Sequence, residues 1–244
     1  MDPGLVFRLV GRTLERTGGD QQAALRMVER ATRWTGRARS PARSPAQAPP
    51  LTSATVRALR LAFRLHRDQV RTGTTVPYVA HLLGVAGIVM RTGGSEREVV
   101  AALLHDAVED QGGARTMRRI QRGFGPEVAR IVDQVTERPG SWLRRKQQAI
   151  HHIASGQTTT GALRVKLADC LHNTGTMTRN ARREGDGFWT RFSGRKRGSL
   201  WYHRSMARAF QGVTIDQPLL RGLSDRLTRQ VVRLHQVADP TAAR

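Results

Sequence analysis

Histidine and carboxylate side chains occur at three places in the chain, in an order that suits metal chemistry. They are His81 in PYVAH, His105 and Asp106 in LLHDAVED, and Asp169 in VKLADCLHN. Neutral imidazole nitrogens and carboxylate oxygens are ligands for manganese, iron, zinc or magnesium, and no thiolate is required. Two histidines and two aspartates from three helices could hold one ion and leave positions open for water and a phosphate. Such an ion acidifies its water and neutralises charge on a reacting phosphate oxygen.

A second pair of carboxylates follows the His-Asp dipeptide. Glu109 lies four residues after His105 and Asp110 four after Asp106, so each pair shares one face of a helix. From there the second pair could orient an attacking water or protonate a leaving oxygen. The cluster follows an apolar AALLH run, and we expect the helix that carries this run to be at least half buried. Buried carboxylates repel one another and lose hydration, which is unfavourable unless a cation compensates.

These residues lie within five segments that together resemble a known family. The segments are HRDQ (66–69), VPYVAH (76–81), ALLHDAVED (102–110), FGPEVARIVDQVTE (124–137) and VKLADCLHN (165–173). They are similar to the HD-domain superfamily of metal-dependent phosphohydrolases. More narrowly, they resemble its alarmone hydrolase branch, which comprises the hydrolase domain of RelA/SpoT proteins and the small stand-alone alarmone hydrolases. The resemblance is clear over roughly residues 55–180 and loose over 180–238.

The resemblance implies an HD-domain helical bundle, one Mn²⁺ ion per chain and an enzyme of the stringent response. The implied reaction is hydrolysis of the 3′-pyrophosphate of ppGpp or pppGpp, giving GDP or GTP and pyrophosphate. The implied metal ligands are His81, His105, Asp106 and Asp169, and the implied catalytic residues are Glu109 and Asp110. The implied substrate-binding residues are Arg71 for the guanine, Tyr78 for the nucleotide pocket, Lys146 for phosphate and Asn173 for ribose or phosphate.

The chain departs from the family pattern at two places. The family usually has a basic pair after HRDQ, whereas here Arg71 is followed by Thr72 and Gly73. The family commonly continues after KLADxLHN into an arginine-containing turn, whereas this chain has Thr-Gly-Thr at 174–176. Each departure removes one expected contact with the substrate.

Helical periodicity and helix caps predict an all-α fold, with no convincing run of strand residues. Ser95 and Glu98 form a capping-box pattern, and Pro77 and Pro126 stand where a first-turn proline belongs. The segment 179–198, which is basic and rich in glycine, is expected to be a loop. The expected helices are 52–71, 77–91, a helix following Ser95, a helix from 126 through 135, 142–153, 162–177, 200–210 and 218–237.

The same patterns predict four segments along the chain. Residues 1–36 are expected to form an N-terminal amphipathic helical extension. Residues 37–50 (RARSPARSPAQAPP) have the composition of a linker. The phosphohydrolase domain is expected to occupy residues 51–238, followed by a tail at 239–244.

Composition limits the class of protein further. The 244 residues include 41 Lys+Arg against 19 Asp+Glu, a formal net charge of +22, and nearly all the basic residues are arginines. This excess indicates either a phosphate-rich partner or the amino-acid usage of a GC-rich genome. The single cysteine, Cys170, excludes an internal disulfide framework. The chain has neither a membrane-spanning run nor a secretory h-region, so we expect a cytoplasmic protein without membrane contact.

Another HD nucleotidase, acting on a nucleoside monophosphate or NADPH, stays open as a substrate variant, and two further alternatives to a free alarmone hydrolase remain. The first is an antitoxin-type hydrolase that removes pyrophosphate from the 3′ end of tRNA and binds the tRNA through the basic flank Arg179–Arg208. The second is a catalytically silent HD module that binds nucleotide as a regulator. The other histidines lack ligand partners at useful spacing and are expected to be surface or packing residues; they are His66, His151, His152, His172, His203 and His235.

Overall fold

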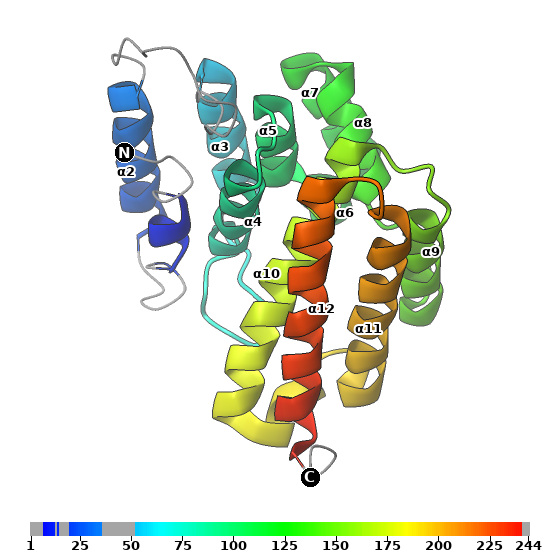
Figure 1. The fold of residues 1–244 in the computed structure, drawn as a ribbon. Coiled ribbons are helices and arrows are strands. Elements are labelled where there is room, and N and C mark those ends of the chain that lie inside the picture. Colours follow the sequence, from blue (N-terminus) through cyan, green and yellow to red (C-terminus); the bar gives the residue numbers. More distant parts are fainter. Residues whose placement is uncertain (1–6, 13, 15–19, 36–51, 241–244) are drawn as a thin grey trace. The chain divides into compact units, whose positions relative to one another are not determined.

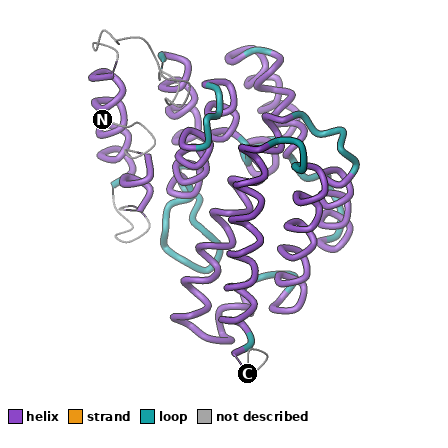
Figure 2. Tube along the Cα trace, in the orientation of Figure 1, coloured by secondary structure: helices purple, strands orange, loops and turns teal. Residues whose placement is uncertain are grey.

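The structure, a computed structural model, describes residues 7–12, 14, 20–35 and 52–240, with backbone only for 29–35. Throughout these ranges the chain is helix, turn or loop (Figure 2), and the only β feature described is an isolated bridge between Val70 and Pro77. The predicted all-α fold is therefore confirmed. The chain forms two compact units, residues 1–136 and 137–244, which are described separately below.

The first unit is built around two helices that are apolar on nearly every side. Helix α4 buries eleven of its residues, and α5 buries every residue from Glu98 to Leu104. A helix that is apolar all round belongs in the interior, and α3 and α8 pack against this pair. The helices of this unit are α2 (Gln21–Thr35), α3 (Ser53–Leu65), α4 (Val79–Arg91), α5 (Glu96–Leu104), α6 (Ala107–Asp110), α7 (Gly113–Phe124) and α8 (Pro126–Val135) (Figure 1).

Polar contacts at the starts of α3 and α5 set the register between these two helices. The capping box predicted at Ser95 and Glu98 is present. Glu96 Oε1 accepts hydrogen bonds from the hydroxyl groups of Thr52 and Thr55, both at 2.7 Å. Although partial burial opposes ionisation, these bonds lower the pKa of Glu96. Because α5 carries its apolar run directly into His105, these contacts also position the site.

Helix α3 ends at Leu65, so the prediction that it continues to Arg71 was wrong. The chain turns after His66 and doubles back through Gly73, whose φ of 67° is in the left-handed region. The Arg71 N–H donates to the Val76 carbonyl at 2.8 Å and the Tyr78 N–H to the Gln69 carbonyl at 2.9 Å. This reversal brings HRDQ beside the start of α4.

The second unit consists of long helices. They are α9 (Trp142–Ala154), α10 (Thr160–Glu184), the 3₁₀ helix η1 (Gly185–Arg191), α11 (Arg195–Val213) and α12 (Pro218–Ala238), with α10, α11 and α12 side by side in Figure 1. The loop predicted over 179–198 was wrong, because most of that segment is helical. Phe188 and Trp189 anchor it in an apolar cluster with Met177 and Leu234. The sequence analysis did not predict that these two aromatic residues are core residues, because basic residues surround them in the sequence.

Contacts of Gly175 and of its neighbour Thr174 explain the local sequence in the second unit. A Cβ on Gly175 would lie 2.4 Å from Nε2 of Gln230, which donates to the Leu171 carbonyl, so this position admits no side chain without movement. The neighbouring Thr174 hydroxyl bonds to Nδ1 of the buried His203 at 3.1 Å. The Thr-Gly-Thr sequence at 174–176 therefore serves packing of α10 against α11 and α12.

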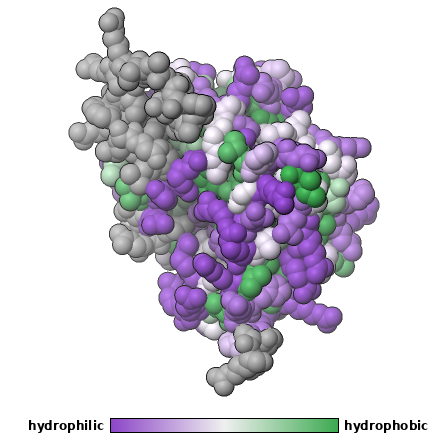
Figure 3. All heavy atoms as spheres, viewed as in Figure 1, coloured by the Kyte–Doolittle hydropathy of each residue, from purple (hydrophilic) through white to green (hydrophobic). Residues whose placement is uncertain are grey.

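Residues near the N-terminus contribute to the core of the first unit. Phe7, Val10 and Leu14 are almost fully buried, and Nε2 of Gln21 donates to the Arg67 carbonyl at 3.2 Å. The predicted linker 37–50 lies outside the described residues, and the bounds of the four predicted segments remain predictions. No described helix is long and apolar enough to cross a membrane. The face drawn in Figure 3 is mostly hydrophilic, with small, separate apolar areas.

Candidate metal centre

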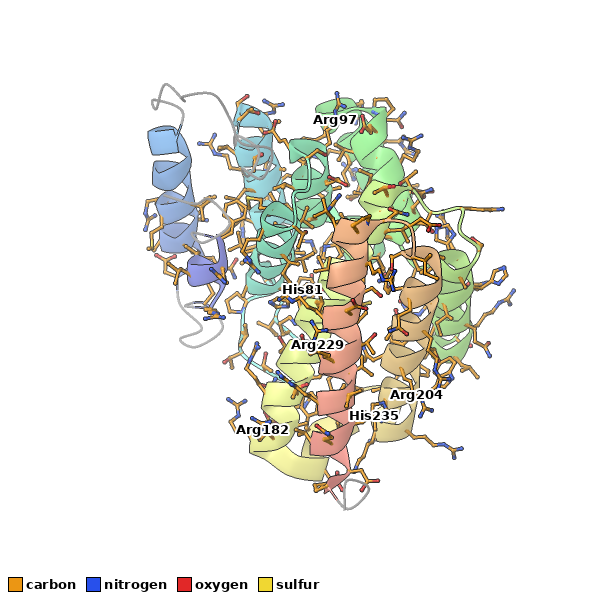
Figure 4. All side chains as sticks on the ribbon, viewed as in Figure 1. His81, Arg97, Arg182, Arg204, Arg229 and His235 are labelled. Carbon is orange, nitrogen blue, oxygen red and sulfur yellow. The ribbon has the colours of Figure 1, made fainter. Side chains whose placement is uncertain are left out.

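Two histidines and one aspartate come together in the first unit. The ligand atoms of His81, His105 and Asp106 lie within 4.8 Å of one another. Oδ2 of Asp106 is 3.0 Å from Nε2 of His105 and 3.5 Å from Nε2 of His81. Both histidines are buried, and Figure 4 shows His81 on α4. The structure thus brings together three of the four residues that the sequence analysis assigned to the metal.

The end of α5 determines which nitrogen of His105 faces the cluster. Nδ1 of His105 lies 2.9 Å from the Ala102 carbonyl oxygen. Because a carbonyl only accepts, Nδ1 carries the proton and Nε2 presents its lone pair toward Asp106. A lone pair facing a carboxylate oxygen at 3.0 Å is repulsive unless a proton or a cation lies between them. This donor set therefore fits a divalent cation, and its imidazole and carboxylate chemistry suits a transition metal.

Charge and hydrogen bonding keep Asp106 ionised. Burial disfavours the charged carboxylate, but charge and hydrogen bonds from His105 and His81, when these rings carry a proton toward Asp106, outweigh this and hold the pKa of Asp106 well below its usual range. With the rings neutral, a bound cation would take the place of those protons. The Tyr78 hydroxyl adds a hydrogen bond to Oδ2 at 2.7 Å. Tyr78 also stacks on His66, with ring centroids 5.2 Å apart. An ionised carboxylate with a fixed orientation is the form that ligates a metal.

Gln69 is a positioning residue that the sequence analysis did not single out. Its Nε2 donates to Oδ2 of Asp110 at 2.8 Å, and its Oε1 lies 2.6 Å from Nδ1 of His66. Nε2 of Gln111 donates to the same Oε1 at 2.7 Å. The sequence did contain a signal for Gln69, because it is the last residue of the HRDQ segment. That segment was used only as evidence of the resemblance to the HD-domain superfamily. His66 is fully buried, as expected of a packing histidine.

The second carboxylate pair lies one turn beyond the cluster and is exposed. The apolar run before the cluster is buried as expected, whereas Glu109 and Asp110 reach the surface because α5 ends at Leu104 and the short α6 follows. The Asp110 N–H still donates to the Asp106 carbonyl at 2.9 Å, so one helical turn joins them. Loss of hydration raises the pKa of Asp110 and the charge of Asp106 adds to this, while the Gln69 hydrogen bond opposes it.

Arg71, assigned to the guanine of the substrate, lies over the ring of Tyr78. Its guanidinium carbon is 5.4 Å from the ring centroid. Tyr78 in turn contacts Asp106 and the edge of His81, with ring centroids 5.6 Å apart in the latter case. These two predicted substrate-binding residues therefore form a stack next to the metal cluster.

Asp169 belongs to the second unit, on the buried part of α10. Lys166 Nζ donates to its Oδ2 at 3.0 Å, and Asn173 Nδ2 donates to its Oδ1 at 2.6 Å. Burial alone lowers the pKa of a lysine, but the charge of Asp169 outweighs burial and raises the pKa of Lys166 well above its usual range. The roles of Asp169 and Asn173 in metal and substrate binding stay predictions.

Lys146, assigned to phosphate, has two neighbours within the second unit. Its Nζ donates to Oε1 of the almost fully buried Glu137 carboxyl group at 2.5 Å and lies 4.8 Å above the ring of Tyr202.

Cys170 is a buried free thiol, and burial raises its pKa to about 12. The expectation of an inert thiol at this position is confirmed.

An all-helical fold with a His-His-Asp cluster at the end of a buried helix defines a class of metal-binding helical domains. The sequence pattern of the family described as HD domain matches residues 58–198. The chain belongs to this HD domain family.

Related proteins confirm the predicted resemblance to the alarmone hydrolase branch. The guanosine-3′,5′-bis(diphosphate) 3′-pyrophosphohydrolases MESH1 of Mus musculus and Homo sapiens are each 38% identical over 120 residues, 48% of this chain and 65% of theirs. A probable GTP pyrophosphokinase of Mycobacterium leprae is 36% identical over 124 residues, 50% of this chain and 15% of that protein. The matches thus span less than two thirds of these relatives.

Solved structures support the same assignment. A metazoan ortholog of SpoT that hydrolyses ppGpp has a TM-score of 0.60 and 26% identity, covering 74% of this chain and 96% of that chain. A protein of Listeria monocytogenes EGD-e has a TM-score of 0.57 and 30% identity, covering 65% of this chain and 97% of that chain.

Proposed function

We propose that this protein is a divalent-metal-dependent hydrolase that removes the 3′-pyrophosphate of ppGpp or pppGpp. The observation that carries the proposal is the convergence of His81 Nε2 and His105 Nε2 on one oxygen of Asp106, in a chain of the HD domain family. The names of the related pyrophosphohydrolases supply the substrate class. Mn²⁺ is the proposed ion, one per chain, with Asp169 as the fourth ligand.

The chain's own residues divide the remaining work. A divalent cation bound by the cluster supplies Lewis-acid charge that activates water and neutralises phosphate. We assign proton transfer from the attacking water to Glu109, one helical turn after His105. Asp110, whose pKa is raised and whose carboxylate is held by Gln69, is assigned to the proton of the leaving oxygen. Arg71 and Tyr78 are assigned to the guanine side of the substrate, and Lys146 and Asn173 to its phosphates and ribose.

Ion pairs within the basic flank weaken the case for the tRNA alternative. Arg183 and Arg191 both pair with Glu184, and Lys196 pairs with Asp186. These three cations are partly neutralised inside the segment that was expected to contact tRNA. No observation favours tRNA over the free alarmone, so we do not advance the antitoxin role.

Pyrophosphate release with added Mn²⁺ tests the proposal. The full chain is given ppGpp or tRNA bearing a 3′-pyrophosphate, at physiological salt. We expect turnover of ppGpp by wild type and by Asp216→Ala, which removes an exposed aspartate. We expect no turnover and no Mn²⁺ binding by Asp106→Ala. Activity of Asp106→Ala without metal, or turnover of the tRNA alone, would contradict the proposal. If neither substrate is hydrolysed, the result would favour the catalytically silent HD module.

A further inference from the structure

A pocket of about 530 Å³ lies in the first unit, lined by α2, α3 and its following turn, and α7. None of the described residues that line it is acidic. Its arginines come from two separate parts of the chain: Arg57, Arg60, Arg64 and Arg67 from α3 and the turn after it, and Arg119 from α7. The pocket shares no residue with the His81, His105 and Asp106 cluster.

The α3 arginines follow the period of the helix. Arg57, Arg60 and Arg64 are spaced by three and four residues, so they lie on one face, and Arg67 continues the series. All are exposed. The run from Arg57 to Arg64 extends over roughly 10 Å at a helical rise of about 1.5 Å per residue, and Arg67 follows in the turn after the helix. A row of like charges repels itself, and a bound polyanion relieves that repulsion.

Several of these arginines have no acidic partner among the residues that the structure describes. Arg64, Arg67 and Arg119 form no ion pair with any described residue. By contrast, Arg97 elsewhere in the same unit pairs with Glu127 at 2.7 Å. Guanidinium groups with free donors suit phosphate oxygens, which they can contact with two parallel hydrogen bonds.

The floor of the pocket is apolar. Leu61 and Phe63 are almost fully buried beneath it, while Leu25 and Phe124 are half-buried at its sides. The volume falls within the range of small-molecule and cofactor sites. Arginines that converge from two helices on a bounded apolar pocket suit a compact ligand with both a ring and several charges. They suit an extended nucleic-acid strand less well.

We propose that this arginine-lined pocket binds a nucleoside polyphosphate. The guanidinium groups of α3 and Arg119 contact the phosphates, and the base lies against the apolar floor beside Phe124. The site is separate from the metal cluster, so binding there requires neither a bound metal nor hydrolysis.

Calorimetric titration of the full chain tests the site, with EDTA present so that hydrolysis is absent. The ligands are GTP, inorganic tripolyphosphate and a single-stranded RNA of about 20 nucleotides, at physiological salt. Arg64→Gln/Arg67→Gln removes two pocket cations. Arg226→Gln/Arg229→Gln is the matched control, because it removes two exposed arginines at the same spacing on α12. Gly123→Leu is a second test that keeps the charge, since a Cβ at Gly123 meets no atom within 4 Å.

We expect GTP to bind wild type and the α12 control equally. In Arg64→Gln/Arg67→Gln we expect a loss of affinity of about tenfold or more, as for lost charge-assisted hydrogen bonds. Gly123→Leu is expected to weaken the binding of GTP more than that of tripolyphosphate, because the leucine side chain narrows the pocket without removing charge. Equal GTP binding by the pocket variants and wild type would overturn the proposal. If tripolyphosphate binds as tightly as GTP does, the base does not contribute to binding and that part of the proposal is overturned. If only the RNA binds, the proposal that the ligand is a nucleoside polyphosphate is overturned.

Discussion

The hydroxyl of Tyr78 donates a 2.7 Å hydrogen bond to Oδ2 of Asp106, the same oxygen that faces Nε2 of His81 and of His105. Burial raises the pKa of Tyr78 well above its usual range, and the charge of Asp106 reinforces this, so the hydroxyl keeps its proton. The bond joins the start of α4 to Asp106, which lies two residues after the end of α5. It therefore restrains the carboxylate in the orientation that the cluster requires.

Removal of that hydroxyl is expected to weaken metal binding without destroying the cluster. In Tyr78→Phe, Asp106 keeps its contacts with His81 and His105 but loses the hydrogen bond that fixes the rotation of its carboxylate. Loss of such a partner to a ligand typically costs about 10- to 100-fold in metal affinity. Calorimetric titration of Mn²⁺ measures the change, and circular dichroism checks that the variant is folded. An affinity equal to that of wild type would show that Tyr78 does not position Asp106.

Glu109→Gln is expected to separate metal binding from turnover. Glu109 is exposed and is not among the clustered ligand atoms, so the variant should bind Mn²⁺ as wild type does. Turnover of ppGpp should fall roughly a hundredfold or more, because a positioned acid or base contributes on that order. Glu127→Gln is the control, since it changes another exposed glutamate of the same unit. If Glu109→Gln turns over ppGpp as fast as the control, Glu109 is not the catalytic base.

Acidification is expected to destabilise the protein through His203. Burial lowers the pKa of His203 from 6.5 to about 4; the charge of Asp169 opposes this and that of Lys146 adds to it. Between these values the unfolded chain binds more protons than the folded chain. The free energy of unfolding therefore falls as the pH drops from above 6.5 to 4, by on the order of 3 kcal/mol from this group.

Urea unfolding between pH 7.5 and 4.5 measures this dependence. His203→Gln should flatten the pH dependence, although it loses stability at neutral pH because the Thr174 contact changes. Burial also lowers the pKa of His66 and His235, so some dependence should remain. An unchanged slope in the variant would mean that His203 is not protonated on unfolding in this range.

Gly194 and Gly198 are expected to tolerate no side chain. A Cβ on Gly194 would lie 2.3 Å from Cζ2 of Trp142, and one on Gly198 would lie 2.8 Å from its Cη2. Because the indole is large and rigid, each alanine variant should lose about 1–3 kcal/mol. Gly212→Ala, in α11 like Gly198, meets open space and should gain up to about 1 kcal/mol from helix propensity. Thermal unfolding compares the three, and equal melting temperatures would show that Trp142 moves freely.

The sequence by itself determined the helical class, most helix starts and three candidate metal ligands that the structure brings together. Caps and first-turn prolines act locally, so Ser95 with Glu98 and Pro126 marked helix starts correctly. His81, His105 and Asp106 were found because the order of their motifs resembles a family. The length of α3 and the helical segment after α10 were missed, since burial of Phe188 and Trp189 overrides a basic, glycine-rich composition.

Tertiary structure decided the contacts between residues distant in sequence. Gln69 reaches Asp110 across 41 residues, and Tyr78 reaches Asp106 across 28. It also decided which carboxylates are buried, because the end of α5 leaves Asp106 inside while Glu109 and Asp110 reach the surface. Residue types and local spacing specify helices and candidate ligands. Solvation and partners depend on how helices pack, and packing is a property of the whole chain.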